Sequence, residues 1–177
     1  MNQHNYNVRS ATIDDCQEIA SVHVKAWQES YAGIVSPQYL ENISFDERLK
    51  LREKILTENN LDCIHLVAVV DNTIIGFCDA GPSFIASEQY RGEIYAIYLL
   101  EKYKNLGIGS KLIKSAHAHL VQKNLVPYIT SVLKKNESAR KFYEKNGGHL
   151  FDEETVDIGN EYYPESVYIF ELEEVKY

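Results

Sequence analysis

The stretch from residue 94 to residue 124 constrains the fold more than any other part of this sequence. Residues 94–100 are apolar and aromatic, and their pattern predicts a strand. A loop at residues 104–110 follows, with Gly107 and Gly109 close together, and apolar residues then recur at helical spacing up to residue 124. A strand, a short glycine loop and an amphipathic helix in this order predict a fold of the mixed α/β class.

The rest of the chain shows the same mixture of strand and helix patterns. Apolar runs flank Asp71 and Asn72, which predicts a hairpin with a two-residue turn. An acidic loop over residues 152–164 is expected between the last two strands. No internal repeat or linker is visible, so residues 1–177 are predicted to form a single domain. The expected strands are residues 8–11, 64–70, 73–80, 94–100, 127–133, 149–152 and 165–172, and the expected helices begin near Thr12, Ser36, Ser44, Ser110 and Asn136.

Composition places the chain among globular proteins, because 45% of its residues are hydrophobic and 25% are charged. Cys16, Cys63 and Cys78 are odd in number and not closely paired, which fits neither a disulfide framework nor a zinc site. His117 and His119 would face apart on a helix, so no metal site is expected. No apolar run approaches the roughly 18 residues that span a membrane, and a cytoplasmic protein is expected.

Charge is unevenly distributed along the chain. The net charge is -8, yet residues 91–145 carry 11 basic and 4 acidic side chains. Residues 1–90 carry 6 basic and 13 acidic side chains, and residues 152–177 carry 9 acidic side chains and one lysine. The middle of the chain is therefore suited to an anion and its flanks to a cation, with chance clustering on solvated faces as the alternative.

The loop at residues 104–110 has the features of an anion-binding cradle. A strand that leads through a glycine loop into a helix presents unpaired backbone N–H groups at the positive end of that helix. Gly107 and Gly109 would let a phosphate approach the backbone, and Lys104 and Lys111 add positive charge. The loop is not a dinucleotide-binding fingerprint, because Leu112 occupies the third glycine position, and it is not a P-loop, because no Gly-Lys-Ser/Thr occurs.

Two longer blocks resemble the motifs of one enzyme family. The first begins at Ile94 and reads Ile-Tyr-Ala-Ile-Tyr-Leu-Leu-Glu-Lys-Tyr-Lys-Asn-Leu-Gly-Ile-Gly-Ser-Lys-Leu. The second begins at Asn136 and reads Asn-Glu-Ser-Ala-Arg-Lys-Phe-Tyr-Glu-Lys-Asn-Gly. In order and spacing they resemble the acetyl-CoA-binding motifs of the GNAT superfamily of N-acetyltransferases. Lys104 stands where Arg or Gln is usual, and Asn105 stands where many members have Gly.

The resemblance covers about residues 8–172 and implies a single-domain GNAT-like fold, in which a mixed, mostly antiparallel sheet of about seven strands is flanked by helices. It implies that the glycine loop holds the pyrophosphate of acetyl-CoA and that a bulged fourth strand pairs with the pantetheine arm. Asn136 matches a position near the thioester, and it is also a good helix N-cap. The cofactor-binding residues implied are Tyr98, Leu99, Lys104, Asn105, Leu106, Gly107, Ile108, Gly109, Ser110 and Asn136.

The resemblance also implies a catalytic tyrosine. Tyr143 matches the residue that in many members protonates the departing thiolate, a role that suits a phenol, although Tyr143 would also serve as a core residue beside Phe142. Glu93 begins the strand that lines the family's active site and would accept the proton of the amine through water, unless it is an exposed strand-end charge. His23 is expected to be a core or pocket-wall histidine.

The acceptor side is expected to combine aromatic and acidic residues. Trp27, Tyr31 and Tyr162 are predicted to form an aromatic wall near the thioester. The acidic residues at 152–164 would form a rim farther away, because carboxylates attract a cationic amine but also raise its pKa.

These features predict an acetyl-CoA-dependent N-acetyltransferase that acetylates a small, cationic amine by direct attack in a ternary complex. A non-catalytic acyl-CoA-binding regulatory module on the same fold is the alternative, and it would bind the cofactor without turnover. A transferase acting on aminoacyl-tRNA would need a broad basic surface, which a net charge of -8 disfavours. The expected partner is the small amine, without nucleic acid or membrane, and a homodimer is left open.

Overall fold

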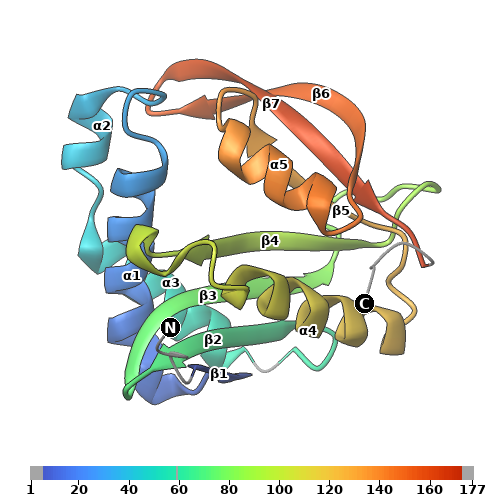
Figure 1. Ribbon diagram of the computed structural model, residues 1–177, viewed down its shortest axis with the longest axis horizontal. Coiled ribbons are helices and arrows are strands. Elements are labelled where there is room, and N and C mark those ends of the chain that lie inside the picture. Colours follow the sequence, from blue (N-terminus) through green and yellow to red (C-terminus); the bar gives the residue numbers. More distant parts are fainter. Residues whose placement is uncertain (1–5, 59, 173–177) are drawn as a thin grey trace.

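The computed structural model describes residues 6–58 and 60–172, which form one sheet flanked by helices (Figure 1). The strands are β1 (Tyr6–Ser10), β2 (Ile64–Val70), β3 (Thr73–Pro82), β4 (Gly92–Leu99), β5 (Tyr128–Leu133), β6 (His149–Ile158) and β7 (Glu161–Phe170). The helices are α1 (Cys16–Ser30), α2 (Pro37–Glu41), α3 (Phe45–Thr57), α4 (Ile108–Gln122) and α5 (Glu137–Lys145), with 3₁₀ turns η1 (Ile13–Asp15) and η2 (Glu101–Tyr103). Within these residues, no helix is both long enough and apolar enough to cross a membrane.

The sheet has the order β1-β2-β3-β4-β5-β7-β6. Every neighbouring pair is antiparallel except β4 and β5, which are parallel. The expected mixed, mostly antiparallel sheet of about seven strands with flanking helices is therefore confirmed.

Helices cover both faces of the sheet, which explains why the central strands are mostly apolar, with Asp79 of β3 as a buried exception. On β2, Leu66, Ala68 and Val70 pack with residues of α4, whereas Val67 packs with residues of α1 on the opposite face. Figure 1 shows α4 and α5 in front of the sheet and α3 behind it. The two faces thus contribute two separate hydrophobic clusters, one on each side of the strands.

A buried ion pair attaches α3 to the back of the sheet. Arg52 of α3 and Asp79 of β3 form this pair, and the Nδ1 atom of His65 lies 2.8 Å from the second carboxylate oxygen of Asp79. The guanidinium of Arg52 also lies 4.3 Å from the ring centre of Phe77. Removing one partner of such a pair leaves an uncompensated buried charge, so the pair fixes the position of α3.

The strands β4 and β5 separate soon after they begin. Their parallel pairing is limited to Gly92 with Tyr128 and Glu93 with Ile129. The register between β3 and β4 also shifts, so that Tyr95 is an extra residue on β4, and a bulge of this kind bends its strand. Beyond the bulge, one edge of β4 pairs with β3 while its other edge faces an open space between β4 and β5.

The last two strands form a long hairpin instead of flanking an acidic loop. The turn consists of Gly159 and Asn160, with φ values of 62° and 67°, as a two-residue turn of the hairpin type requires. The expectation of a loop at residues 152–164 is therefore wrong. Exposed acidic side chains lie along β6 because β6 is an edge strand, where charge prevents pairing with another chain.

Candidate active site

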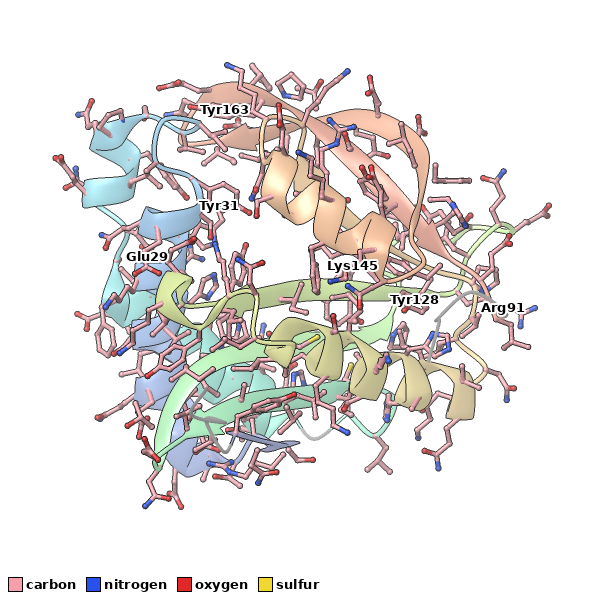
Figure 2. All side chains as sticks on the ribbon, in the orientation of Figure 1. Glu29, Tyr31, Arg91, Tyr128, Lys145 and Tyr163 are labelled. Carbon is pink, nitrogen blue, oxygen red and sulfur yellow. The ribbon has the colours of Figure 1, made fainter. Side chains whose placement is uncertain are left out.

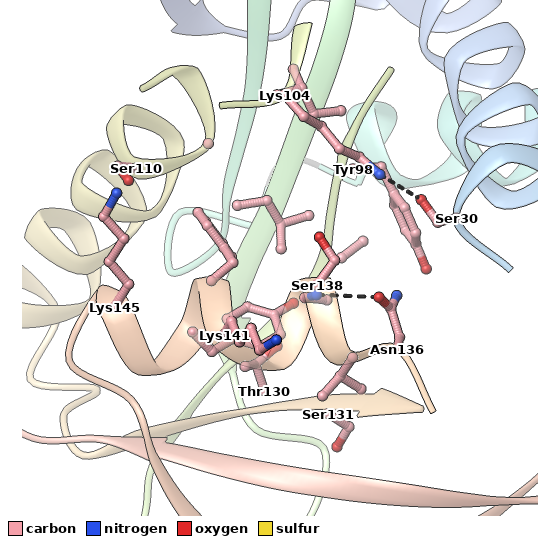
Figure 3. Close-up of a pocket in the computed structure, with 18 of the residues that line it drawn as sticks. Ser30, Tyr98, Lys104, Ser110, Thr130, Ser131, Asn136, Ser138, Lys141 and Lys145 are labelled. Carbon is pink, nitrogen blue, oxygen red and sulfur yellow. Dashed lines mark hydrogen bonds between the residues drawn. The ribbon is translucent and has the colours of Figure 1, made fainter. Parts of the chain in front are cut away.

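A cavity of about 490 Å³ occupies the space between the separated ends of β4 and β5. In Figure 3, α4 lies on one side of this cavity and α5 on the other. Its lining contains Lys104, Lys141 and Lys145 and no aspartate or glutamate, although the chain has a net charge of -8. A wall with this composition favours an anionic ligand.

Most of the site residues expected from the sequence line this one cavity. They come from the end of α1, from β4, from the glycine loop and from α5. The residues concerned are Tyr31, Tyr98, Leu99, Lys104, Asn105, Gly107, Gly109, Ser110, Asn136 and Tyr143.

The glycine loop presents free backbone donors to the cavity. Gly107 is the N-cap of α4, with a φ of 82°, and no side chain caps the helix. The N–H groups of the first turn are therefore not satisfied by a side chain. A Cβ atom at Gly107 would have only the Tyr6 hydroxyl within 4 Å, at 3.8 Å, so the space beside the loop is open. This geometry fits a phosphate group.

Gly109 has a different role from Gly107. A Cβ atom at Gly109 would lie 3.1 Å from Cε2 and 3.3 Å from Cζ of Phe142 on α5. The absence of a side chain at this position therefore lets the first turn of α4 approach α5 closely. The spacing of the two glycines in the sequence predicts only that a phosphate approaches the backbone. It does not predict this contact between α4 and α5.

Lys104 ties the glycine loop to the C-terminal end of α1. Its ammonium lies 2.5 Å from Oε2 of Glu101 and 3.4 Å from Oγ of Ser30, the contact drawn in Figure 3. The backbone N–H of Glu101 donates to Oε2 of Glu29 at 2.8 Å. The positive charge of Lys104 is thus already paired with a carboxylate.

Helix α5 places Asn136 and Tyr143 on the cavity wall. Asn136 caps the helix, because its Oδ1 atom accepts a hydrogen bond from the N–H of Ala139 at 3.2 Å. Tyr143 is only 6% exposed and packs 5.4 Å from the ring of Phe142, yet it lines the cavity. Burial raises the pKa of Tyr143, so its phenol is protonated at neutral pH and is able to donate a proton.

Aromatic residues form the wall at the α1 end of the cavity. The hydroxyls of Tyr31 and Tyr98 lie 3.5 Å apart, and both residues line the cavity. Trp27 packs against Tyr31 with ring centres 4.8 Å apart, outside the cavity lining. His23 stacks on Tyr98 at 5.2 Å, and burial is the main cause that lowers its pKa to about 3. His23 is therefore a neutral residue behind the wall.

Three other residues expected at the site point elsewhere. Leu106 is 45% exposed, and Ile108 is fully buried in the core under α4. Tyr162 is 76% exposed, whereas the next residue, Tyr163, packs near α2 and its hydroxyl accepts from the N–H of Ser36 at 3.2 Å. In Figure 2, Tyr163 lies above Tyr31 on the same side of the molecule.

Glu93 lies at the start of β4 and is not part of the cavity lining. Its carboxylate is half-buried and accepts a hydrogen bond from Oγ of Ser83 at 3.3 Å. Burial raises the pKa of Glu93, and the charge of Glu154 raises it further. Any proton transfer between Glu93 and a group in the cavity would therefore pass through water.

Glu165 on β7 is a half-buried carboxylate that the sequence did not single out. Burial raises its pKa, and the charges of Glu154 and Glu93 raise it further. Burial also raises the pKa of Tyr31 and Tyr143, and the charge of Glu165 adds to both shifts, although Glu165 itself is not part of the cavity lining. None of the three glutamates forms an ion pair within residues 6–58 and 60–172.

Sequence reasoning also missed residues that tertiary structure brings to the cavity. Thr130 of β5 lines it and donates from Oγ1 to the carbonyl of Ile94 at 3.1 Å. Lys141 and Lys145 of α5 line it from the opposite side. Their spacing of four residues places both on one helix face, and this was the only signal in the sequence that could have identified them.

Comparisons with known proteins agree with this architecture. A model of the acetyltransferase (GNAT) family matches residues 23–148, a range that includes both motif blocks. The chain is 29% identical over 154 residues to a spermidine N(1)-acetyltransferase of Thermoplasma acidophilum, covering 85% of this chain and 92% of that protein. It is also 29% identical over 151 residues to an uncharacterised N-acetyltransferase of Bacillus subtilis, covering 85% and 84%. The crystal structure of the PaiA N-acetyltransferase of Thermoplasma acidophilum in complex with coenzyme A is similar, with a TM-score of 0.71, 28% identity and coverage of 91% and 98%.

Proposed function

The chain belongs to the acetyltransferase (GNAT) family and is an N-acetyltransferase that uses acetyl-CoA, and we propose that it acetylates a small, multiply cationic amine by direct attack in a ternary complex. The observation that carries this proposal is a group of carboxylates that have no ion-pair partner among the described residues, Glu93, Glu154 and Glu165. Their charges act on one another, and the charge of Glu165 also acts on Tyr31 and Tyr143 of the cavity lining. The name of the spermidine N(1)-acetyltransferase relative supports the same class of acceptor.

The cavity suits the two ends of the cofactor differently. The open loop around Gly107 and the first turn of α4 would hold the pyrophosphate on backbone N–H groups. The free edge of β4 at residues 96–99 would pair with the amides of the pantetheine arm, as a strand edge pairs with an extended peptide. The thioester then lies toward Tyr98, Asn136 and Tyr143.

Tyr143 is the proposed proton donor. Transfer forms a bond between the amine nitrogen and the acetyl carbon and breaks the bond between that carbon and sulfur, so the sulfur leaves as a thiolate. The buried phenol of Tyr143 would donate its proton to that thiolate, and the proton that the nitrogen loses as the amide forms would restore the phenol. The amine must first lose a proton, and Glu93 would receive it through water.

The carboxylates would hold the part of the acceptor that does not react. A half-buried carboxylate without a cationic partner is energetically costly, and a bound ammonium group would remove much of that cost. Glu165 meets this description, and like-charged Glu93 and Glu154 increase the cost. A second ammonium group on a polyamine would bind here while its reacting amine remains neutral near Tyr143.

An acceptor screen with acetyl-CoA that follows thiol release tests the proposed function. We expect turnover with spermidine and related polyamines and much weaker turnover with an anionic amine such as glutamate. Cofactor binding without thiol release from any amine would instead support a non-catalytic acyl-CoA-binding module.

The substitution Glu165→Gln tests the proposed acceptor contact. Because it removes the charge and keeps the shape, we expect the KM for spermidine to rise by about tenfold and the KM for acetyl-CoA to stay unchanged. Glu153→Gln is the matched control, since Glu153 is exposed on the same hairpin and pairs with Lys134 at 2.7 Å. Equal effects of the two substitutions would contradict a specific role for Glu165.

A further inference from the structure

Two lysines on α5 give the cavity positive charge that is either unpaired or only weakly paired among the described residues. Lys141 and Lys145 both line it, one helical turn apart. No carboxylate pairs with Lys145 in the part of the chain that the structure describes. Lys141 makes only a long contact of 3.9 Å with Glu137, and both of these side chains are 77% exposed. Lys104, in contrast, is paired with Glu101.

The packing of α4 on α5 brings Lys145 to the glycine loop. Phe142 of α5 fits against Gly109 in the first turn of α4, where a Cβ atom would come within 3.1 Å of the ring. Lys145 follows Phe142 by three residues and therefore lies on the same side of α5. Figure 3 shows its side chain pointing toward Ser110 of α4. Its ammonium is thus next to the end of α4 that binds anions.

Two like charges four residues apart on a helix repel each other. A ligand with a double negative charge between Lys141 and Lys145 would remove this repulsion, whereas a singly charged group would do so only in part. A phosphate monoester carries a charge of about -1.5 to -2 at neutral pH. Coenzyme A has one such group, the 3′-phosphate, whereas each of the two phosphoryl groups of its pyrophosphate carries a single charge and suits the backbone N–H groups of the loop.

We propose that Lys141 and Lys145 form the subsite for the 3′-phosphate of coenzyme A, so that the enzyme distinguishes coenzyme A from its 3′-dephospho form. The two lysines bind the monoester, and the first turn of α4 binds the pyrophosphate. This inference concerns the cofactor alone and does not depend on the identity of the acceptor.

Calorimetric titration of coenzyme A and 3′-dephospho-coenzyme A tests this subsite. For the unmodified protein we expect tighter binding of coenzyme A, by about tenfold or more. The double variant Lys141→Gln/Lys145→Gln should bind coenzyme A about tenfold more weakly and 3′-dephospho-coenzyme A as before. Because both side chains are exposed, we expect the variant to fold normally, and its thermal unfolding will verify this.

Lys111→Gln is the matched control. Lys111 follows Ser110 on α4 and is exposed, but it does not line the cavity. The control should retain the preference for coenzyme A. The proposal is overturned if the double variant keeps this preference, if it loses affinity for both ligands equally, or if Lys111→Gln removes the preference to the same extent.

Discussion

Tyr143 has the position that a core residue needs and also the position that a proton donor in the cavity would need. Its ring packs in the core, with its centre 5.8 Å from that of Tyr168, and it also forms part of the cavity wall. Burial stabilises the packing, and it also raises the pKa of the phenol, which keeps the proton on the oxygen at neutral pH. A thiolate released in the cavity would be adjacent to this donor.

The substitution Tyr143→Phe keeps the ring and removes the proton donor. We expect turnover to fall by roughly 10²-fold, with little change in affinity for coenzyme A or in thermal stability. Tyr168→Phe is the control, because the Tyr168 hydroxyl is bonded to Arg140 and Glu144 and lies outside the cavity lining. It should lower stability by about 1 kcal/mol and leave turnover unchanged. Normal turnover of Tyr143→Phe would leave Tyr143 with a packing role only.

Single residues of the site were predictable where a motif fixes the backbone around them. Gly107 and Asn136 are such cases, since one has a positive φ and the other caps a helix. Ile108 belongs to the same motif as Gly107, but its position on α4 directs its side chain toward the hydrophobic core. Glu165 and Lys145 were not predictable in this way, because their relation to the cavity depends on strand order and helix packing.

The elements around the cavity depend on how closely α4 approaches α5. Gly109 allows this approach, since Phe142 occupies the space where a side chain at position 109 would lie. Gly107 contributes an unusual backbone angle and open space instead. Gly109 therefore determines the helix packing and Gly107 determines the shape of the anion-binding loop, although the two glycines look equivalent in the sequence motif.

Valine substitutions separate these two roles. Gly107→Val should weaken binding of coenzyme A, because the side chain fills the cradle and strains the backbone by about 1–2 kcal/mol. Gly109→Val should lower the melting temperature, because it displaces Phe142, and it should reduce turnover by shifting the adjacent Tyr143.

A double-mutant cycle verifies the packing role of Gly109. Adding Phe142→Leu to Gly109→Val should relieve the overlap, which gives a favourable coupling of about 1 kcal/mol or more in the free energy of unfolding. The same cycle with Gly107→Val should give a coupling near zero. A coupling near zero in both cycles would contradict the assigned packing role.

Elements were predictable where both periodicity and end signals were strong. The turn at Asp71 and Asn72 follows the expected hairpin pattern, with φ values of 49° and 62°. The hairpin at Gly159 and Asn160 has the same kind of turn, but its first strand, β6, was not predicted at full length because the sequence there is strongly acidic. Most residues of β6 are exposed, so the strand shows little alternation of polar and apolar residues and resembles a loop in sequence.

At the scale of the whole molecule, the positive charge of the cavity lining is separated from a group of carboxylates on β4, β6 and β7. The cavity lining has three lysines and no carboxylate, while Glu93, Glu154 and Glu165 lie outside that lining and have no ion-pair partners among the described residues. The segment charges of the sequence anticipated the basic centre and the acidic flanks. They could not locate the acidic site on the strands, because only the fold brings Glu93 of β4 near Glu165 of β7.

This separation of charge predicts how salt affects the acceptor. The Debye length falls from about 10 Å at 0.1 M to about 3 Å at 1 M ionic strength, so added salt should weaken the attraction between the carboxylates and a polyamine. At a saturating concentration of acetyl-CoA, the KM for spermidine should rise several-fold over this range. The KM for a monoamine should rise less, because a monoamine has no second ammonium group to place beside Glu165. Steady-state kinetics at several salt concentrations measure both values. Turnover of glutamate at a rate equal to that of spermidine, together with a KM of the acceptor that does not change with salt, would show that the enzyme does not select its acceptor by positive charge. The assignment as an N-acetyltransferase would not be affected.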